Sequence, residues 1–387
     1  MKQIIIAFLT VSFLLSLQFL LPQKIFKKYN DDELRKVALS HAMQSNPKNF
    51  NELKKIFDDK NNPLSKDKII LGKKLYFDTI LSKDYIVSCN SCHTIKQHNK
   101  PLLLNSMLGK TKDTLNCTAC HAMDNSGTDR NTFSIGSTES PYKLNAQTIL
   151  NAALAKSFTW SGEVNSLYEQ ISNSIQDDTK MNLSKNEVVK RLKENPVYQI
   201  QFNDVFHEDI SFDNVVKAID AYVKTLLTRG SYDRFLDGDN NAISDEAKRG
   251  FADFINFGCK GCHTGRGVGG QSVQMFPLRH FARIFDLRVN YSFEENKIID
   301  NSFPFENKGG YKGRNGTNFF RVPLLRNVAK TSPYFHNGAV FKIRKAVDIM
   351  AKHQTGKNLT NVQIDEIVEF LKTLSGDIVD YGDFNDK

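Results

Sequence analysis

The residues that can do chemistry are the cysteines, and all six of them fall in three Cys-x-x-Cys-His motifs. The motifs are Cys89/Cys92/His93, Cys117/Cys120/His121 and Cys259/Cys262/His263. This pattern attaches haem c, because two thioethers hold the porphyrin and the adjacent histidine ligates the iron. A structural zinc site needs four ligands, and a redox dithiol needs no histidine behind it. The sequence therefore predicts three covalently bound haem c groups with one histidine of each motif on the iron.

An apolar run at the N-terminus, from Ile4 to Leu21, suits a protein that must be exported to receive its haems. The run approaches the roughly 20 residues that a spanning helix needs, and no small-residue cleavage site follows it. Residues 1–28 are therefore predicted to be an uncleaved hydrophobic signal anchor that tethers a periplasmic protein to the inner membrane. A cleaved signal peptide is the alternative. Three flanking lysines oppose this orientation, but the need for haem attachment outside the cytoplasm outweighs them.

The remaining chain is long enough for two globular domains. A net charge of +9 could suggest nucleic acid, but Lys and Arg are interleaved with Asp and Glu, and no basic stripe with aromatic spacing occurs. Nucleic acid is therefore excluded as a partner. The charge can instead steer an acidic redox partner.

Helical spacing of apolar residues dominates the chain, and strand-like alternation is scarce, so the predicted fold is mainly α. Helices are expected within residues 30–43, 186–195, 212–227, 244–258 and 361–374. Between about 264 and 322 the chain is rich in Gly, Asn and Phe, which indicates long loops around the third haem. The expected boundary gives an N-terminal domain at 29–230 with two haems and a C-terminal domain at 231–387 with one haem and a C-terminal tail.

Several stretches in order resemble the bacterial di-haem cytochrome c peroxidase family, which includes the MauG-type enzymes. They are "LGKKLYFD", "SGTDRNTFSIG", "LNAQTILNAA", "GSYDRFLDGDNNAIS", "FGCKGCHTG" and "RVPLLRNVAKTSPYFHNGAVFKIRKAVDIMAKHQTG". The resemblance implies two cytochrome-c-like domains: the N-terminal one holds the haem where peroxide reacts, and the C-terminal one a high-potential haem that delivers electrons. It implies reduction of hydrogen peroxide to water, with electrons from a small cytochrome c or a quinol-linked donor. Relatives are often homodimers.

Two haem motifs compete for the peroxide-reacting position. Counting forward from "LGK" reproduces the family spacing at Cys89, whereas counting back from "SGTD" reproduces it at Cys117. The stretch between them is therefore interpreted as an insertion that brings an extra haem. The surroundings expected of the reacting haem follow the second motif, so we assign that role to His121 and a relay role to His93; the upstream match keeps the opposite assignment open. Candidate sixth ligands of the His93 haem are His41, Met43, His98 and Met107.

The resemblance implies further roles for single residues. Met350 matches the family's methionine ligand on the C-terminal haem, where MauG-type oxidases carry tyrosine; a core methionine is the alternative. Trp160 matches a tryptophan placed between two haems, with a buried interface aromatic as the alternative. Asn145 and the carbonyls of Thr331 and Pro333 match an interdomain Ca²⁺ site, and oxygen ligands suit that cation. As the alternative, Asn145 is only a turn residue.

The chain departs from the family on the peroxide side. Gln170 matches the distal glutamine, but Ser137 stands where many members have a histidine on the iron, and Lys180 stands at the catalytic glutamate. A protonated lysine cannot act as the base, although a desolvated one could do so or bind iron. Asp177 or Asp178 could supply the carboxylate instead. Otherwise the site is degenerate, and Lys180 points to solvent.

Three functions follow from these residues. The favoured one is a membrane-tethered periplasmic peroxidase, which agrees with Gln170, Trp160 and Met350. The second is a multihaem electron relay or sensor without enzymatic activity, which Lys180 favours. The third is a MauG-like oxidase of another substrate.

Overall fold

The computed structural model describes residues 27–57, 59–95, 126–134, 136, 144–278 and 303–382. In this part the chain is mostly helical, as predicted, and the strands are short. Residues 1–26, which hold the expected anchor, lie outside the described ranges. In the described ranges, no helix is long and apolar enough to cross a membrane.

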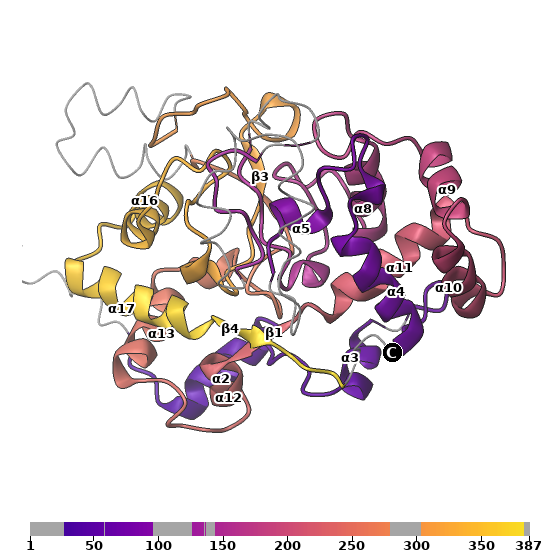
Figure 1. The fold of residues 1–387 in the computed structure, drawn as a ribbon. Coiled ribbons are helices and arrows are strands. Elements are labelled where there is room, and N and C mark those ends of the chain that lie inside the picture. The colour runs from indigo at the N-terminus through magenta and orange to yellow at the C-terminus, as the bar shows by residue number, and fades with distance from the viewer. Residues whose placement is uncertain are drawn as a thin grey trace, which may run out of the picture.

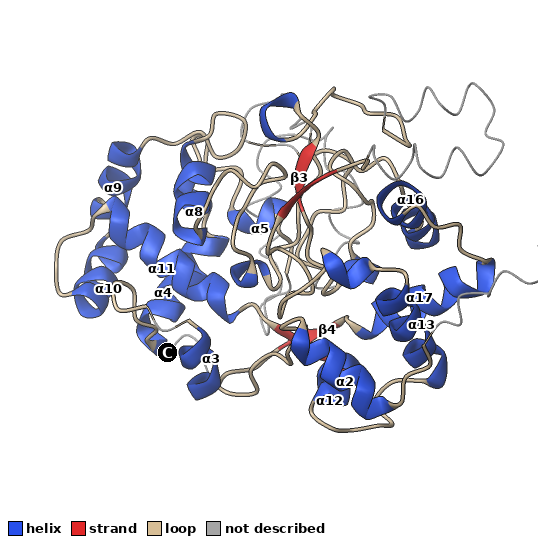
Figure 2. Ribbon diagram, turned by 180° about the vertical axis from the view of Figure 1, so that it is seen from behind, coloured by secondary structure: helices blue, strands red, loops and turns tan. Residues whose placement is uncertain are grey.

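The helices gather in two groups on either side of a loop-rich centre (Figures 1 and 2). One group contains α3 (Phe50–Ile56), α4 (Lys66–Phe77), α5 (Cys89–Cys92), α8 (Leu167–Gln176), α9 (Lys185–Lys193), α10 (Pro196–Phe206) and α11 (Phe212–Thr225). The other contains α2 (Asp31–Ser40), α12 (Ser231–Leu236), α13 (Asp245–Asn256), α16 (Ile343–Thr355) and α17 (Asn361–Thr373). The strands form two antiparallel pairs, β1 (Thr228–Gly230) with β4 (Gly376–Ile378), and β2 (Val273–Met275) with β3 (Phe319–Arg321).

Helix starts follow side chains that accept the first free backbone N–H groups. The N-cap residues Ser65, Ser166, Ser184, Ser211, Ser244 and Thr360 each accept a hydrogen bond from the amide three residues on. Such caps stabilise a helix by about 1 kcal/mol each. The local sequence therefore determines where these helices start.

Each helix group is built on one closely packed pair. In the first, α4 crosses α11 so tightly that a Cβ on Gly72 would lie 1.9 Å from the carbonyl oxygen of Ala218. In the second, α13 crosses α17, and a Cβ on Gly250 would lie 1.7 Å from the carbonyl oxygen of Glu366. Only glycine permits either contact.

Aromatic contacts repeat in the same way. The rings of Tyr76 and Tyr222 are 5.3 Å apart in the first pair, and those of Phe254 and Phe370 are 5.3 Å apart in the second. The two halves thus share one helix-pair design.

A turn of the chain is also repeated between the halves. Phe158 bridges to Val164, and Tyr334 bridges to Val340, each as an isolated antiparallel pair. Before each turn an asparagine adopts a left-handed conformation, Asn151 with φ 61° and Asn327 with φ 63°. Equivalent turns from the two halves meet in the centre of the molecule.

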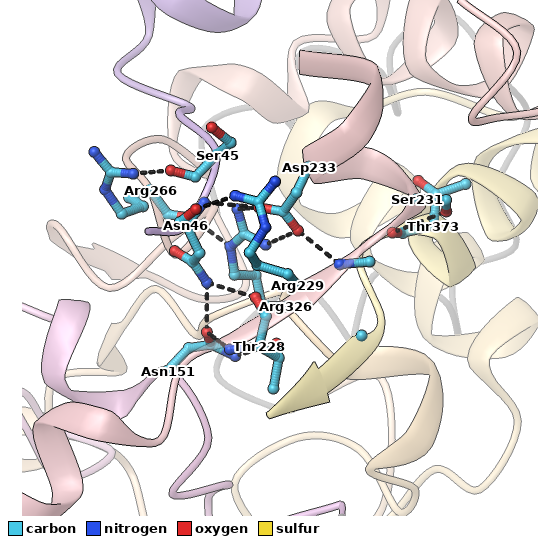
Figure 3. Close-up of polar contacts among 12 residues, drawn as sticks. Ser45, Asn46, Asn151, Thr228, Arg229, Ser231, Asp233, Arg266, Arg326 and Thr373 are labelled. Atoms are coloured by element: carbon cyan, nitrogen blue, oxygen red, sulfur yellow. Dashed lines mark hydrogen bonds and ion pairs between the residues drawn. The ribbon is translucent and has the colours of Figure 1, made fainter. Parts of the chain in front are cut away.

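A buried polar network joins the halves (Figure 3). At its core Arg326 and Asp233 form two parallel hydrogen bonds of 3.0 Å, and their side chains are 1% and 2% exposed. Asp233 also accepts from the amide of Asn46 at 2.7 Å and from that of Gly230 at 2.9 Å. All donors and acceptors of this ion pair are therefore directed at fixed partners, which a buried pair requires.

The same network extends to the repeated asparagines. Asn46 donates to the side-chain oxygen of Asn151 at 2.8 Å and to the carbonyl of Thr228 at 2.7 Å (Figure 3). The Thr228 hydroxyl accepts from both Asn151 and Asn327, at 2.9 and 3.0 Å. Three distant chain segments are thereby tied to the strand that connects the halves.

The N-terminal helix α2 corrects one expectation. Chain order placed residues 29–43 with the first domain, but Leu34, Ala38 and Met43 are buried in the apolar cluster that contains Phe251 and Phe370. The sequence pattern shows which face of α2 is apolar but not which core covers it. The division at residues 230 and 231 otherwise stays a prediction.

We expect Asp233→Ala to lower the free energy of unfolding by about 3–5 kcal/mol, because it leaves the Arg326 charge buried without a partner. Guanidinium unfolding followed by circular dichroism measures this. The matched control is Asp209→Ala, which breaks an exposed 3.3 Å pair with Lys193 and should cost less than about 1 kcal/mol. Equal losses in the two variants would contradict a structural role for the buried pair.

Candidate active site

The first haem motif occupies a single helical turn. Helix α5 spans Cys89–Cys92, and the His93 amide donates to the carbonyl of Cys89 at 3.0 Å. The carbonyl of His93 accepts from the buried Tyr76 hydroxyl at 2.5 Å. Residues three and four apart share one face of a helix, so both thiols and the imidazole serve one group. Helix α4, through Tyr76, fixes where that face points.

The His93 ring is held as a neutral ligand. Its Nδ1 atom is buried, and the carbonyls of Gln147 and Gly127 face the ring. Burial lowers the pKa of His93 to about 4, although these carbonyls act in the opposite direction. A neutral imidazole whose Nδ1 faces backbone oxygen leaves Nε2 available, which is the arrangement of metal-bound histidine.

The third motif repeats this arrangement. The His263 amide donates to the carbonyl of Cys259 at 3.0 Å, and the buried Nδ1 faces the carbonyls of Val268 and Pro323. Burial lowers the pKa of His263 to about 4. Both motifs thus present a buried histidine whose pKa is lowered to about 4.

The thiols themselves fit haem attachment better than the alternatives. Burial raises the pKa values of Cys89, Cys92 and Cys259 to about 12, so the free thiols would not ionise as metal-binding or redox thiolates do. In the described part of the chain, no three His, Cys, Asp or Glu side chains are grouped to hold a metal ion. The second motif, Cys117/Cys120/His121, lies outside the described residues, and so do His98, Met107 and Ser137.

Helix α8 gathers the predicted peroxide-side residues. Gln170, Ser174 and Asp177 follow one another along one side of it, and the Gln170 amide donates to Ser174 at 3.1 Å. The Gln170 side-chain oxygen is buried and makes no hydrogen bond. Lys180 forms a 2.7 Å ion pair with Asp177, and each side chain is about a quarter exposed, at 27% and 28%. The structure thus brings Asp177 and Lys180 together and places Gln170 two turns earlier along the same side, whereas Asp178 is exposed.

Asp177 is held as a carboxylate. Burial alone would raise its pKa, but hydrogen bonds from Lys180 and Thr179 outweigh burial and lower the pKa below its ordinary value. The Thr179 hydroxyl and amide both donate to one carboxylate oxygen, at 2.6 and 2.9 Å. A group that stays ionised near neutral pH can accept a proton.

Lys180 belongs to the surroundings of the first motif. Its positive charge is a minor cause of the lowered pKa of His93, and it slightly opposes the rise that burial causes in the pKa of Cys92. The segment that holds Lys180 also packs against Gly136 of the "SIG" stretch, since a Cβ on Gly136 would lie 2.1 Å from the Thr179 carbonyl oxygen and 2.8 Å from that of Lys180. The charge of Lys180 at His93 supports the alternative assignment of the reacting haem to His93, and the assignment to His121 stays a prediction.

Among the residues near the motif, Asp129 was not expected. It is buried, its pKa is raised by burial, and its charge contributes to the raised pKa of Cys92. It forms part of the "SGTD" stretch, which was used only to count spacing. The "SGTD" stretch was the sequence signal that could have identified Asp129.

Comparison with known proteins decides the family. A model described as di-haem cytochrome c peroxidase matches residues 66–111 and 100–241. The cytochrome c551 peroxidase of Pseudomonas aeruginosa is 32% identical over 321 residues, which is 81% of this chain and 80% of that protein. That of Nitrosomonas europaea is 31% identical, over 82% and 83%. The chain belongs to the di-haem cytochrome c peroxidase family. Peroxidase-type oxidoreductase chemistry with covalently bound haem c follows at the level of the family.

The family also contains oxidases. The methylamine utilization protein MauG of Methylorubrum extorquens is 29% identical, over 75% of this chain and 70% of that protein. Two solved structures share the fold. A MauG-like protein associated with microbial copper homeostasis has a TM-score of 0.61 at 24% identity, covering 84% of this chain and 94% of its own. A dihaem peroxidase from Burkholderia thailandensis has a TM-score of 0.53 at 18% identity, covering 81% and 86%.

Trp160 lies where the repeated turns of the two halves meet. Its indole N–H donates to the carbonyl of Asn145 at 2.9 Å, and its own carbonyl accepts from the Arg321 amide at 2.8 Å. Its ring is 6.4 Å from that of His336, edge to face. His336 holds the equivalent turn position, and its carbonyl accepts from the Asn145 amide at 2.9 Å. The two residues therefore form the aromatic centre of the interface.

His336 is a second residue without an assigned role in the sequence. Its Nε2 is 2.8 Å from the side-chain oxygen of Asn307, and burial lowers its pKa to about 4. The rings of Phe303, Phe305 and Phe320 surround it. Its position opposite Trp160 follows from the internal repeat, which was the signal that could have identified it.

The predicted calcium residues lie at this interface. The Asn145 side-chain amide donates to the carbonyl of Asn131 at 2.7 Å, and the Arg130 guanidinium donates to the carbonyl of Lys330, which precedes Thr331. Pro333 contacts the same region, because a Cβ on Gly338 would lie 3.0 Å both from its ring and from Thr132. Calcium itself stays a prediction.

The remaining candidate ligands fall near the third motif. Met350 is on α16, packed in a cluster that borders the one containing Cys259. The His41 Nε2 is 3.1 Å from Nζ of Lys260, and Met43 is buried beside Tyr232. His41 and Met43 are therefore neighbours of the third motif and not of His93, whereas the ligand role of Met350 stays a prediction.

We expect Trp160→Phe to slow electron transfer between the haems by about tenfold, because the smaller ring loses its bond to Asn145 and its fixed position. Flash reduction followed by haem absorbance measures this rate. Phe158→Leu perturbs the same turn without removing the indole and should leave the rate within about twofold. A Trp160→Phe rate equal to that of the control would rule out the relay role.

Proposed function

We propose that the protein reduces hydrogen peroxide to water at the haem attached through Cys89 and Cys92. Electrons enter at the haem on Cys259 and Cys262 and cross the interface at Trp160. The observation that carries this proposal is the ion pair of Lys180 with Asp177, whose ammonium acts electrostatically on His93. It supplies a proton acceptor and a proton donor where the family has one glutamate.

The two groups divide the work of that glutamate. When bound, the haem supplies the reducing electrons and the coordination position at which peroxide reacts. The Asp177 carboxylate, with its lowered pKa, accepts the first proton from the peroxide. The Lys180 ammonium, 2.7 Å from that carboxylate, donates a proton to the departing oxygen and recovers one from Asp177. Gln170 offers a buried amide oxygen that can orient the peroxide.

The setting of the reaction follows from the sequence. We place the protein in the periplasm, tethered by residues 1–28, with three haems and a Ca²⁺ ion at the interface. The donor is a small cytochrome c or a quinol-linked protein, and the net charge of +9 suits an acidic surface. The protein acts as a homodimer. Cys117, Cys120 and His121 would hold the extra haem, which would supply a relay for electrons.

The acid and base roles can be separated by substitution. Asp177→Asn removes the proton acceptor and should slow peroxide-dependent oxidation of the fully reduced protein by about 10²–10⁴-fold. Lys180→Met should act similarly, whereas Lys180→Glu restores a carboxylate at the family position and should retain activity. Stopped-flow haem absorbance measures all three. Asp178→Asn, at the exposed neighbour, serves as the control and should match the parent protein.

The pH profile gives a second criterion. Because the pKa of Asp177 lies below its ordinary value, the parent rate should stay level as pH falls from 8 to about 5. A rate of the parent protein no faster than that of a six-coordinate cytochrome would contradict the proposal. It would support the electron relay or sensor that the missing glutamate favours.

The identity of the reacting haem can be tested directly. Replacing Cys117 and Cys120 with serine should remove one haem, as counted by the pyridine haemochrome method, and leave fast oxidation by peroxide in place. Removing Cys89 and Cys92 should abolish it. Loss of the reaction only in the Cys117/Cys120 variant would establish the assignment to His121 instead.

A further inference from the structure

A buried guanidinium at the interface of the halves lacks a counter-charge. Arg321 ends strand β3 and is 5% exposed. Its Nε donates to the carbonyl of Thr159 at 3.2 Å, and its Nη2 donates to the side-chain oxygen of Gln147. Its Nη1 is buried and makes no hydrogen bond. No carboxylate of a described residue forms an ion pair with it.

Such an arrangement is unfavourable unless something else is bound. Leaving a buried donor of a charged group unsatisfied costs more than the roughly 1–3 kcal/mol of a neutral donor. Burial lowers the pKa of Arg321 to about 10, and no opposing charge counteracts it. By contrast, the other buried arginine, Arg326, is paired with Asp233 on both of its terminal nitrogens.

A second buried donor lies beside the first. Gln147 accepts from Arg321 through its oxygen, which leaves its own Nε2 buried and without a hydrogen bond. A cationic N–H and an amide N–H on adjacent side chains are complementary to the two oxygens of a carboxylate. The pair therefore has the chemistry of an anion site with no protein anion in it.

The backbone places this site between the two described haem motifs. The Ile149 amide, two residues after Gln147, donates to the carbonyl of Gly127 at 2.9 Å, and the Gly127 amide donates to the carbonyl of Thr94, next to His93, at 3.0 Å. Pro323 is two residues after Arg321, and a Cβ on Gly269 would lie 2.1 Å from its carbonyl oxygen and 3.4 Å from Nδ1 of His263. Haem c carries two carboxylates on its edge, and the family supplies haem to both histidines. A haem propionate therefore matches this site both in its charge and in its expected location.

We propose that Arg321 and Gln147 bind a propionate of one of these two haems and set its reduction potential from across the domain interface. A negatively charged propionate stabilises the oxidised iron and lowers the reduction potential. Pairing with Arg321 neutralises that charge and raises the potential. The inference depends on covalent haem c but not on peroxide reduction, so it survives even if the protein is an electron relay.

Redox titration of the intact three-haem protein tests this binding. Arg321→Gln should shift the midpoint potential of one haem to a lower value and make that potential fall as pH rises between 5 and 8. The reason is that an unpaired buried carboxyl titrates nearer neutrality. Arg321→Lys keeps the charge and should restore most of the parent potential. An unchanged potential and pH profile in Arg321→Gln would overturn the proposal.

A matched control comes from the same interface. Arg314 donates to the carbonyls of Ser161 at 3.1 Å and of Gly162, next to the turn that Arg321 holds. Arg314→Gln should therefore perturb the packing of this turn equally but leave both potentials and their pH dependence unchanged. A shift as large as that of Arg321→Gln would make the effect structural and overturn the proposal.

Gln147→Glu gives an independent test that does not remove the arginine. The new carboxylate pairs with Arg321 and displaces the propionate, so the potential of the same haem should fall. A raised melting temperature with unchanged potentials would instead show that the donors face no propionate. Dependence of the parent potential on added acetate would identify a diffusible anion as the occupant and would likewise overturn the assignment.

Discussion

The structure depends on the buried ion pair of Arg326 with Asp233. Arg326 immediately precedes the left-handed Asn327, and Asp233 lies in the first turn of α12, the first helix after the strand that links the halves. Because both charges are almost fully buried, the network can exist only when each segment around it is in place. The interaction therefore gives specificity more than net stability. Through Asn46 and Thr228, the network around this pair also reaches Asn151 and Asn327, which precede the two repeated turns.

Two backbone hydrogen bonds connect the halves at the centre of the molecule, one at each of the repeated turns. The carbonyl of Trp160 accepts from Arg321, and the carbonyl of the equivalent residue, His336, accepts from Asn145. Arg321 and Asn145 in turn precede Pro323 and Gln147, whose carbonyls face the two haem histidines. Each histidine is thus oriented by a segment whose register is set by the other half. A change in domain packing would reach both irons through backbone atoms.

The electrostatics of the proposed peroxide side differ from those of a single catalytic glutamate. A lone carboxylate must hold and release the proton itself, so its pKa has to lie near the working pH. In the Asp177 and Lys180 pair, hydrogen bonds keep the carboxylate ionised while the ammonium stores the proton. Cationic charge near His93 also suits the binding of an anion formed when the peroxide is deprotonated. The substitution at position 180 is therefore compatible with a working site.

Much of this protein follows from its sequence. The Cys-x-x-Cys-His spacing determines haem attachment because one helical turn brings two thiols and a histidine to one face. Ser, Thr and Asn caps set most of the described helix starts locally. The sequence could not place α2, since an apolar face does not reveal which core will cover it. Nor could it pair Lys180 with Asp177, leave Gln170 with a buried free oxygen, or set Arg321 beside Gln147. Lys180 and Asp177 are only three residues apart, but whether they pair depends on the local turn and on their burial. Arg321 and Gln147 lie in distant segments, and only the packing of the two halves brings them together.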